Sequence, residues 1–493
     1  MCWALSTVFV ISSLFTFGFF ALSFVKFKHN MALSFPGCAA VLCLIALSIR
    51  FYVTYTTEGF TSDMSCFQHW GSMVASDGLD RMYYHQDMFL DYPPGYLYVL
   101  WGCHELSRFL NFWPGMPESK AVFALVPMLS DIVCGIILMV LAKKKMGDFT
   151  ALFVGAAYLF CPAVIINSAQ WGQVDSFCTM LLLVSILFLY YEKWIPCGIF
   201  YGLSAISKPQ MFTFIPVYLF FVLRQKKKVK PLVLGVGSGL FTMMAVSYPF
   251  VYFDFGRIVD LYKECMGGYK FYSVNAYNIW TLLGMNWRDL PQDGLQNIIL
   301  TIAAPIVAVI LCGLLFLSKK KDVVFAAPVL IMTFVFCFAV KQHERYMFPV
   351  MVFALVCYIY SKNIKQFWSF LLLSLCSYLN VGHIFSLFKG EHWQGDMNSV
   401  GAKVFSALTL VSLLFVIYSD IVTYFDWRGL IAKLGFKKQH MQANLEDRFD
   451  SDNDNNAALR DGGVLASGGQ ADATDMLESE GRRERDTVHG AKC

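Results

Sequence analysis

Long apolar runs recur along most of this chain, and they constrain its fold more than any other feature. A helix of about twenty apolar residues spans the hydrocarbon core of a bilayer. Of the 493 residues 57% are hydrophobic and only 15% are charged, a composition that excludes an ordinary soluble domain. We therefore predict an all-α polytopic membrane protein. The predicted spans lie near residues 5–26, 32–52, 121–142, 149–168, 176–191, 231–252, 297–317, 323–340, 346–361, 367–388 and 402–424.

The segment 195–224 is interrupted by Lys208-Pro209 and predicts two short helices that meet near one membrane face. With these two, about thirteen crossings (range about 11–14) are expected. The run at 5–26 is too long for a signal peptide and has no basic region before it, so we take it as a retained first span. The segment 94–112 carries three charged or titratable side chains and is expected to lie at the interface instead of crossing.

Lys and Arg in short loops mark the cytoplasmic side of a membrane protein. With the topology above, all basic clusters fall on that side, and the polar motifs without them fall on the other. The basic clusters are Lys26/Lys28, Lys143 to Lys145, 224–230, Lys319 to Lys321, Lys362/Lys365 and Arg428 to Lys438. The opposite side gathers the loop around Asp63 and Asp91, Trp171 to Asp175, Lys208, 253–280, His343 to Tyr346, and His383 to Asp396. This asymmetry predicts a one-sided, extracytoplasmic site.

The chain divides by composition into two parts. Residues 1–430 form the transmembrane domain, in which 53–120 is a large first extracytoplasmic loop with interfacial helices. Residues 439–493 are rich in Asp, Gly, Ser and Asn and cannot bury a core, so we expect a disordered cytoplasmic tail.

Cysteines fall mostly inside the apolar runs, where they are expected to pack as small hydrophobic side chains. Their scattered spacing matches neither a zinc site nor a disulfide framework. Cys66 and Cys265 can both face an oxidising side, and we do not expect a bridge between them. The cysteines in apolar runs are Cys38, Cys134, Cys161, Cys178, Cys312, Cys337, Cys357 and Cys376.

Two aspartates stand out in the first loop. Asp63 precedes a short predicted helix, and it can cap that helix, as can Ser62. Alternatively, it can act as a general base that takes a proton from an acceptor hydroxyl. Asp91 begins Asp-Tyr-Pro-Pro, where the prolines stiffen the backbone and fix one wall of a site.

The motif Trp171-Gly-Gln-Val-Asp175-Ser176 lies between two predicted spans. Gly172 allows a tight turn, and Asp175 or Ser176 can cap the following helix. The same residues also suit a sugar, since Trp171 offers a stacking face and Gln173 and Asp175 offer hydrogen bonds.

Lys208 and Arg345 are cations at membrane depth or at the outer boundary, where charges are costly and usually functional. With His343 they predict a phosphate site, because Arg binds phosphate as a fork and Lys as a point charge. The alternatives are snorkelling or pairing with Glu344 or Asp131.

The segments DMSCFQHWGSMVASDGLDRMYYHQDMFLDYPPGYLYVLW, WGQVDS, SKPQ, NAYNIWTLLGMNW and HERYMFP together resemble the GT-C superfamily of integral-membrane glycosyltransferases, in order over residues 59 to about 350. They are most similar to bacterial mannosyltransferase-like proteins related to GPI mannosyltransferase II. The resemblance implies a GT-C fold, a polyprenyl-phosphate-sugar donor, mannose favoured as the sugar, and an inverting single displacement at the extracytoplasmic face.

The resemblance also implies roles for individual residues. Asp63 is the expected general base, and Lys208, Arg345 and His343 are expected to hold the donor phosphate. Met64 follows Asp63 where protein O-mannosyltransferases carry an Asp-Glu pair, and no Asp-x-Asp metal motif is present, so neither a metal nor another cofactor is expected. The residues expected to bind sugar or acceptor are Asp91, Tyr92, Trp171, Gln173, Asp175, Gln210, Asn275, Asn278, Trp280 and Glu344.

The expected partners are the lipid-linked sugar, the bilayer, and a hydroxyl on a glycan, glycolipid or protein; nucleic acid is not expected. The membrane is the bacterial plasma membrane by preference, or the endoplasmic reticulum if the source is eukaryotic. Two other functions stay open: a transporter or flippase of lipid-linked saccharides, and a non-catalytic relative that binds lipid-phosphate-sugars.

Overall fold

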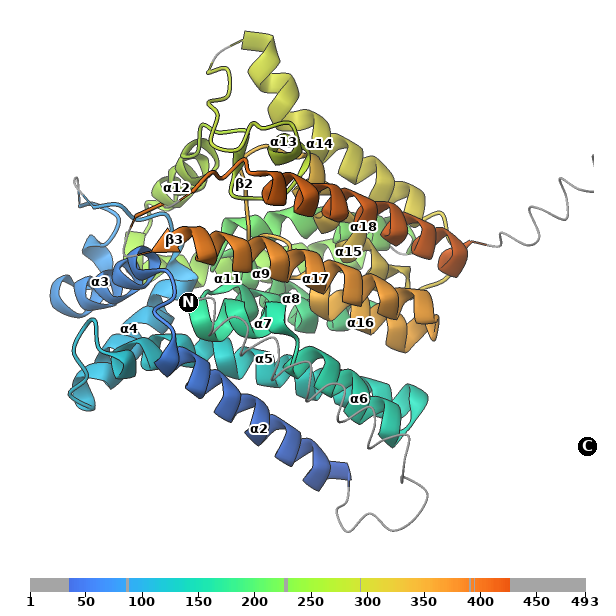
Figure 1. Cartoon of the computed structure of the whole chain (residues 1–493), viewed down its shortest axis with the longest axis horizontal. Coiled ribbons are helices and arrows are strands. Elements are labelled where there is room, and N and C mark those ends of the chain that lie inside the picture. The colour runs from blue at the N-terminus through green and yellow to red at the C-terminus, as the bar shows by residue number, and fades with distance from the viewer. Residues whose placement is uncertain are drawn as a thin grey trace, which may run out of the picture. The chain divides into compact units, whose positions relative to one another are not determined.

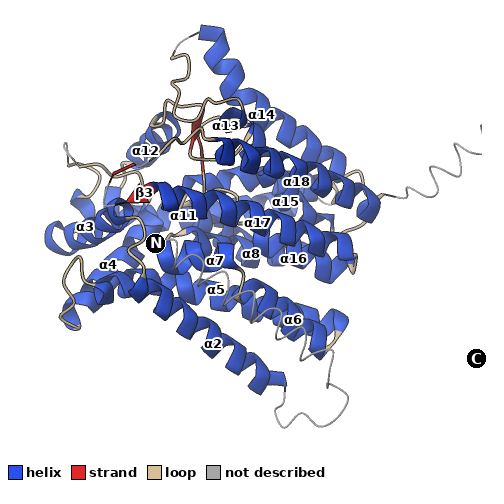
Figure 2. Cartoon of the chain, viewed as in Figure 1, coloured by secondary structure: helices blue, strands red, loops and turns tan. Residues whose placement is uncertain are grey.

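The structure is a computed structural model that describes residues 35–425, apart from 86–87, 226–228, 293, 390–391 and 394. All described residues belong to the first of two compact units, Met1–Phe425. Helices make up 77% of the structure, and the few strands are two residues long, so the predicted all-α fold is confirmed (Figure 2). The predicted first span at 5–26 and the predicted tail at 439–493 lie outside the described residues.

Six of the described helices are long and apolar enough to cross a membrane. A seventh span is added if α6 (Asp148–Leu159) and the segment Pro162–Trp171, which meet at 47°, are counted as one. Pro162 explains this break, because it has no N–H to continue the helix. The six are α2 (Phe35–Thr56), α5 (Pro117–Met146), α11 (Val229–Val251), α14 (Gly294–Leu315), α17 (Ile364–Leu387) and α18 (Val400–Tyr424).

The remaining predicted spans within the described residues correspond to shorter apolar helices. The chain is therefore a multi-pass membrane protein. The total of about thirteen crossings stays a prediction. The Lys208-Pro209 interruption separates two of them, as expected, with Pro209 opening the second. These shorter elements are α8 (Asp175–Tyr190), α9 (Trp194–Ala205), η3 (Pro209–Phe214) with α10 (Ile215–Leu223), α15 (Val323–Phe338) and α16 (Val350–Ser361).

The first loop contains the predicted surface helices, which are α3 (Thr61–Asp77), η1 (Leu79–Arg81) and α4 (Pro94–Phe109). In Figure 1 they lie with α12 (Phe255–Gly267) at one end of the bundle. The capping prediction for Asp63 is wrong, because α3 begins two residues earlier and Phe60 is at the N-cap. Asp63 lies in the first helical turn instead, where the positive end of the helix dipole favours a carboxylate.

Short strands tie distant loops together at this end. The pairing of β1 (Ser273–Val274) with β2 (Gln342–His343) is parallel and joins the 253–280 loop to the segment that carries Arg345. The strands β3 (Phe388–Lys389) and β4 (His392–Trp393) pair antiparallel. The remaining described elements are α7 (Pro162–Ile165), η2 (Ile166–Trp171) and α13 (Ile279–Leu282).

Basic side chains of the clusters at 143–145 and 319–321 lie close to the ends of several helices. Lys320 Nζ donates to the carbonyl of Thr423 near the end of α18, and Lys321 pairs with Glu192 just after α8. Lys145 at the end of α5 lies over the Tyr360 ring at the end of α16. The clusters at 26–28 and 428–438 lie outside the described residues, and the cytoplasmic placement of the basic clusters stays a prediction.

Helices α9 and α11 approach so closely that only glycine fits between them. A Cβ atom on Gly198 would lie 2.1 Å from the carbonyl oxygen of Gly235, and one on Gly202 would lie 2.6 Å from that of Gly239. Two facing Gly-xxx-Gly pairs of this kind let helix backbones pack closely in a membrane.

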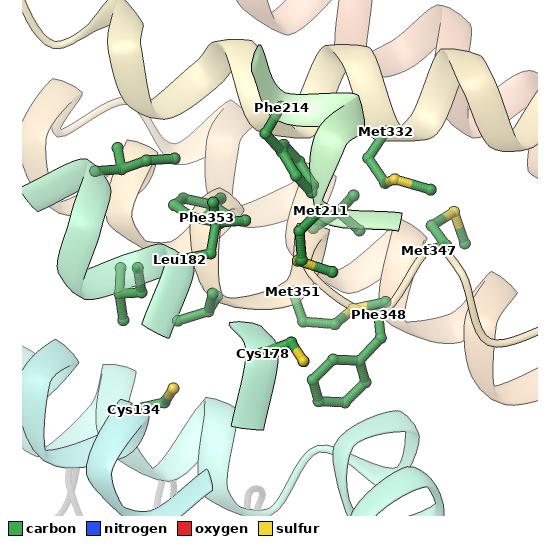
Figure 3. Close-up of a cluster of buried hydrophobic side chains, with 14 of the residues drawn as sticks. Cys134, Cys178, Leu182, Met211, Phe214, Met332, Met347, Phe348, Met351 and Phe353 are labelled. Atoms are coloured by element: carbon green, nitrogen blue, oxygen red, sulfur yellow. The ribbon is translucent and has the colours of Figure 1, made fainter. Parts of the chain in front are cut away.

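The interior of the bundle is rich in sulfur (Figure 3). Cys134, Cys178 and Met211 pack among Leu182 and Phe214 in one large buried cluster. The predicted packing role is confirmed for the cysteines of the apolar runs, which are buried apart from the half-buried Cys38. Cys66 and Cys265 are free thiols.

Candidate active site

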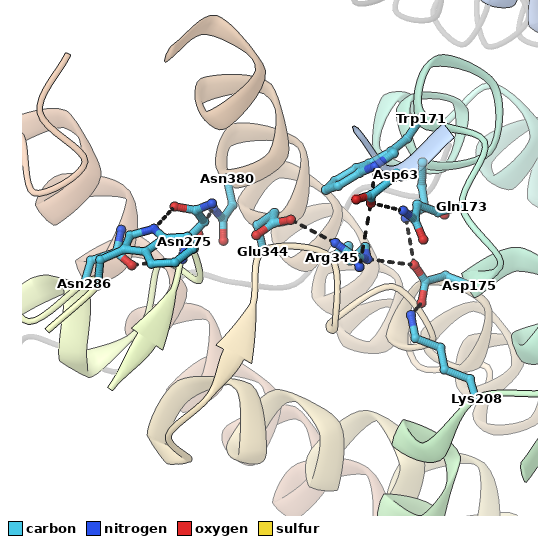
Figure 4. A network of polar contacts seen from close by, with 12 residues as sticks. Asp63, Trp171, Gln173, Asp175, Lys208, Asn275, Asn286, Glu344, Arg345 and Asn380 are labelled. Atoms are coloured by element: carbon cyan, nitrogen blue, oxygen red, sulfur yellow. Dashed lines mark hydrogen bonds and ion pairs between the residues drawn. The ribbon is translucent and has the colours of Figure 1, made fainter. Parts of the chain in front are cut away.

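Asp63 is held by one carboxylate oxygen and keeps the other available. Its Oδ2 accepts hydrogen bonds from Trp171 Nε1 at 3.0 Å and from Gln173 Nε2 at 2.5 Å (Figure 4). Its Oδ1 accepts none from any residue that the structure describes, and the side chain is 30% exposed. A carboxylate fixed in orientation with one free, accessible oxygen has the geometry that a general base needs.

The turn that carries Trp171 and Gln173 lies at the end of an irregular helix. Residues Ile166–Trp171 form a π-helical turn, a feature often found at functional sites. It ends at Gly172, whose φ of 78° is left-handed, and a Cβ atom there would lie 2.8 Å from Met64 Cε. Glycine is therefore required both for the turn and for the close approach of α3.

The two predicted cations meet at this turn. The Lys208 ammonium pairs with the fully buried Asp175, and Arg345 Nη1 donates to Glu344 at 3.2 Å. The Arg345 guanidinium also lies 3.9 Å from both Asp63 Oδ2 and Asp175 Oδ2. Sequence motifs separated by up to 282 residues, from 63 to 345, thus form one network in Figure 4.

Both cations retain unused donors. Lysine has three N–H donors, and Lys208 uses one of them on Asp175 among the described residues. Arg345 is 14% exposed, its Nε has no hydrogen-bond partner in the described part, and its guanidinium stacks 4.8 Å above the Trp171 ring. An additional anion can therefore be bound without breaking every existing ion pair.

Of the two acidic partners suggested for Lys208 and Arg345, Glu344 and Asp131, the structure shows one. Arg345 does pair with its neighbour Glu344. Asp131 pairs with neither cation; it binds Arg50, whose Nε lies 3.2 Å from Asp131 Oδ2, with both side chains fully buried. Sequence analysis missed Arg50, although a lone Arg and a lone Asp in two separate spans are a signal for such a pair.

The prediction that Asp175 or Ser176 caps α8 is wrong. The N-cap is Val174, and no side chain caps the helix. The Asp175 carboxylate instead accepts a hydrogen bond from Asn167 Nδ2 at 3.3 Å and binds Lys208. Its role is to connect the π-helical turn to the Lys208 bend.

His343 lies at the edge of the network as a neutral imidazole. Burial lowers its pKa well below the usual value, and the nearby Arg345 and Lys208 charges lower it further. Its Nε2 has no hydrogen-bond partner among the described residues, and its ring lies edge-on to Tyr269 at 4.4 Å. His343 therefore adds a hydrogen-bonding group to the site and no positive charge.

Two carboxyl groups beside Asp63 hold their protons more tightly than usual. Burial raises the pKa of Glu344 to about 7, against a lowering by Arg345. Burial likewise raises the pKa of Asp91, and the Asp63 charge adds to that rise. The cluster is therefore less negative at neutral pH than its number of carboxyl groups suggests.

Several of the other predicted residues make contacts that hold the local structure, and their roles in sugar binding stay predictions. Tyr92 donates to Gln173 Oε1 at 3.4 Å, and Gln210 donates to the Tyr346 carbonyl at 2.6 Å. Asn278 caps α13, and Trp280 Nε1 donates to the Phe338 carbonyl at 3.1 Å.

Asn275 adopts a left-handed backbone with φ of 64° and accepts a hydrogen bond from Trp287 Nε1 at 2.7 Å. Its amide N–H donates to Asn286, and its carbonyl accepts from Asn380. These contacts place Asn275 next to β2, which leads into Glu344 and Arg345 (Figure 4).

The described residues include no group of three or more His, Cys, Asp or Glu side chains that could hold a metal ion. The expectation that the protein needs no metal stays a prediction.

Comparison with known proteins found two similarities. Residues 77–258 match the family model described as GPI transamidase subunit PIG-U. Over 183 residues the chain is 27% identical to a dolichyl pyrophosphate Glc1Man9GlcNAc2 alpha-1,3-glucosyltransferase from Candida glabrata. That match covers 34% of this chain and 32% of the relative, so the chain spans about a third of the length of the curated relative it matches.

These similarities agree with the broader part of the resemblance, to membrane glycosyltransferases, and neither is to a mannosyltransferase. The PIG-U match contains Asp91, the Trp171 turn and Lys208, and it ends before Arg345.

Proposed function

We propose that this protein transfers a hexose from a polyprenyl-phosphate-linked donor to a hydroxyl acceptor at the extracytoplasmic face of a membrane. The observation that carries the proposal is the Asp63 carboxylate, which Trp171 and Gln173 hold by Oδ2 while Oδ1 stays open. Lys208 and Arg345 lie in the same network with unused donors. A base and an anion site side by side suit attack on a sugar phosphate.

The proposed reaction is a single displacement. Asp63 Oδ1 takes the proton of the acceptor hydroxyl as that oxygen attacks the anomeric carbon of the donor sugar. The bond between this carbon and the phosphate oxygen breaks, and the polyprenyl phosphate leaves with the electron pair. The anomeric configuration inverts. Unused N–H donors of Arg345 and Lys208 stabilise the charge that develops on the leaving phosphate.

The glucosyltransferase similarity supports a hexose and a lipid-linked substrate, because the relative's name contains both. It favours glucose, whereas the sequence motifs favour mannose, so the experiment below compares the two donors. The relative comes from a eukaryote, which favours the endoplasmic reticulum over the bacterial plasma membrane as the location.

A second candidate is a non-catalytic subunit that binds lipid-linked sugars. The match to the PIG-U model favours it, since that family is described as a transamidase subunit. Asp63 and Arg345 lie outside that match, so this candidate requires neither residue for its function.

The deciding experiment uses purified protein in nanodiscs with radiolabelled dolichyl-phosphate-glucose and, in parallel, dolichyl-phosphate-mannose. Transfer to membrane-extracted glycans and slow release to water are followed for wild type and Asp63→Asn. Loss of a general base lowers turnover by about 10²–10⁴-fold. Donor binding should survive in Asp63→Asn, because Asn keeps the size of the side chain.

Asp77→Asn is the matched control, because Asp77 ends the same helix and its carboxylate pairs with His85 away from the network. It should turn over donor like wild type. Donor binding without turnover in wild type would reject the enzyme and favour the subunit. Equal turnover in Asp63→Asn and Asp77→Asn would reject Asp63 as the general base.

A further inference from the structure

Two contacts fix the path of the chain just before α3. At the end of α2, Lys120 Nζ donates to the carbonyl of Thr57 at 2.6 Å. The following Gly59 lies against the π-helical turn, because a Cβ atom on Gly59 would be only 2.2 Å from the Gln170 carbonyl oxygen. The chain therefore enters α3 pressed against the turn that ends at Trp171.

Phe60, the N-cap residue of α3, belongs to an aromatic cluster at this point. Its ring stacks on Trp171, with the centroids 5.3 Å apart and an angle of 24° between the planes. It also stacks on Phe388 at 4.2 Å and 10°, and Phe385 lies edge-on to it at 5.7 Å. Phe60 thus joins the linker before α3, the Trp171 turn and the end of α17.

The Trp171 indole is enclosed by its neighbours and is only 1% exposed. Phe385 lies edge-on to it at 5.1 Å, and the Arg345 guanidinium lies 4.8 Å from the ring centroid. The indole Nε1 donates to Asp63 Oδ2 at 3.0 Å. The N–H bond lies in the plane of the ring, and a hydrogen bond weakens steeply when it is misaligned. The groups that set the plane of the indole therefore also aim this hydrogen bond.

Phe60 has a special place among these groups. It lies three residues before Asp63 and stacks on the side chain that holds the Asp63 carboxylate. A leucine at this position would keep an apolar side chain but remove the flat surface against which the indole packs. The indole could then tilt, and its N–H would turn away from Asp63.

We infer that Phe60 is a positioning residue of the proposed active site. Its ring sets the plane of Trp171, and through the Trp171 N–H it holds Asp63 by Oδ2, with Oδ1 toward the acceptor. The inference rests on the proposed function. Phe60 acts through Trp171 and takes no part in the chemical step itself.

The test compares Phe60→Leu, which removes the ring, with Phe60→Tyr, which keeps it. Phe200→Leu is the matched control, because Phe200 in α9 is partly buried like Phe60 and stacks on Phe188 at 5.7 Å and 28°. For each protein in nanodiscs we would measure kcat and KM with the lipid-linked donor that wild type uses. Thermal unfolding shows whether each variant is folded.

Phe60→Leu should lower kcat by about tenfold, which is the effect of losing a hydrogen bond to a charged group. Donor KM should stay within about twofold of wild type, because Arg345 keeps its ion pair with Glu344. Phe60→Tyr and Phe200→Leu should match wild type. Trp171→Phe, which lacks the N–H, should also lower kcat. Adding Phe60→Leu to it should lower kcat no further, since both changes remove the same hydrogen bond.

A second measurement does not depend on turnover. In protein made with fluorine-labelled tryptophan, the NMR resonance of Trp171 is the one that disappears in Trp171→Phe. This resonance should shift in Phe60→Leu, because the indole loses the ring stacked on it. It should keep its wild-type position in Phe200→Leu.

The possible results separate the inference from the proposed function. Wild-type kcat in a folded Phe60→Leu protein, or additive losses in its combination with Trp171→Phe, would overturn the inference and leave the transferase intact. An unmoved Trp171 resonance in Phe60→Leu would overturn the orienting role itself. A wild-type protein that never turns over donor would reject the transferase, and the resonance would still decide whether Phe60 orients the indole.

Discussion

The buried ion pair between Arg50 and Asp131 joins α2 to α5 and gives the sharpest stability prediction. Arg50 Nη1 also donates to the Leu159 carbonyl at the end of α6, at 2.9 Å, and the Tyr158 hydroxyl lies 3.5 Å from Asp131. The Ser168 side chain is close to the same carboxylate. The pair therefore anchors the broken helix that ends in the Trp171 turn. We consider Arg50→Met, Asp131→Leu and the double variant.

The expected cost follows from burial and distance. Both side chains are 0% exposed, and their closest N and O atoms are 3.2 Å apart. Coulomb's law with an effective dielectric constant of about 20 gives an attraction of about 5 kcal/mol at that distance. Removing one partner leaves an unpaired buried charge, which typically costs about 3–5 kcal/mol. Asp131→Leu should fall at the lower end, because Arg50 keeps its bonds to the Leu159 and Ala46 carbonyls.

The double variant should be more stable than either single variant, because it leaves no unpaired charge. Its loss should be at least about 2 kcal/mol smaller than the sum of the single losses. The measurement is the free energy of unfolding in mixed micelles, from an SDS titration followed by tryptophan fluorescence. Loss of donor turnover at temperatures where Asp131→Leu is still folded would show that the Trp171 turn has shifted.

The control is the surface pair Lys263–Asp260, which is shorter at 2.8 Å but has side chains 67% and 56% exposed. Neither Lys263→Met nor Asp260→Leu should change the free energy of unfolding measurably, because exposed ion pairs are well solvated and contribute little. A loss for Asp131→Leu no larger than that for Asp260→Leu would refute the stabilising role of the buried pair.

Two further predictions concern the site and its support. The pKa of Glu344 is about 7 in the folded protein and 4.5 in the unfolded chain, so the folded state binds this proton more tightly. The free energy of unfolding should therefore fall by on the order of 3 kcal/mol as pH rises from 4.5 to above 7. Glu344→Gln should remove that part of the slope in thermal unfolding between pH 5 and 8, and an unchanged slope would contradict the shift. Gly59→Ala should destabilise by at least about 2 kcal/mol, because φ is +71° and the new Cβ would lie 2.2 Å from the Gln170 carbonyl. Gly102→Ala, in an open helical position, should instead add up to about 1 kcal/mol in the same unfolding assay.

Sequence patterns were sufficient for the elements whose cause is local. Apolar runs predicted the helices, and Pro209 placed the break between α9 and η3 correctly, because proline acts on its own backbone. The segregation of charge by loop was enough to predict that Asp63, the Trp171 turn, Lys208 and Arg345 share one end of the bundle.

Features set by tertiary contacts could not be predicted in this way. Asp63 and Asp175 both lie near a helix N-terminus, where a side-chain cap is favourable. Each instead binds a side chain distant in the sequence: Asp63 accepts a hydrogen bond from Trp171, and Asp175 pairs with Lys208. The position of Arg345 also depends on the pairing of β1 with β2, the strand just before it. Strands of two residues are too short to leave a recognisable pattern in a sequence.

The charges of the network argue for a site that is completed by its substrate. Lys208 and Arg345 face Asp63 and Asp175, and Glu344 holds its proton up to about neutral pH, so the cluster is close to balanced before a donor arrives. A phosphate that takes the unused donors of Arg345 draws the guanidinium away from Asp63 Oδ2, 3.9 Å distant. In the proposed reaction Asp63 Oδ2 then keeps its hydrogen bonds from Trp171 and Gln173, which hold the carboxylate in place while Oδ1 faces the acceptor.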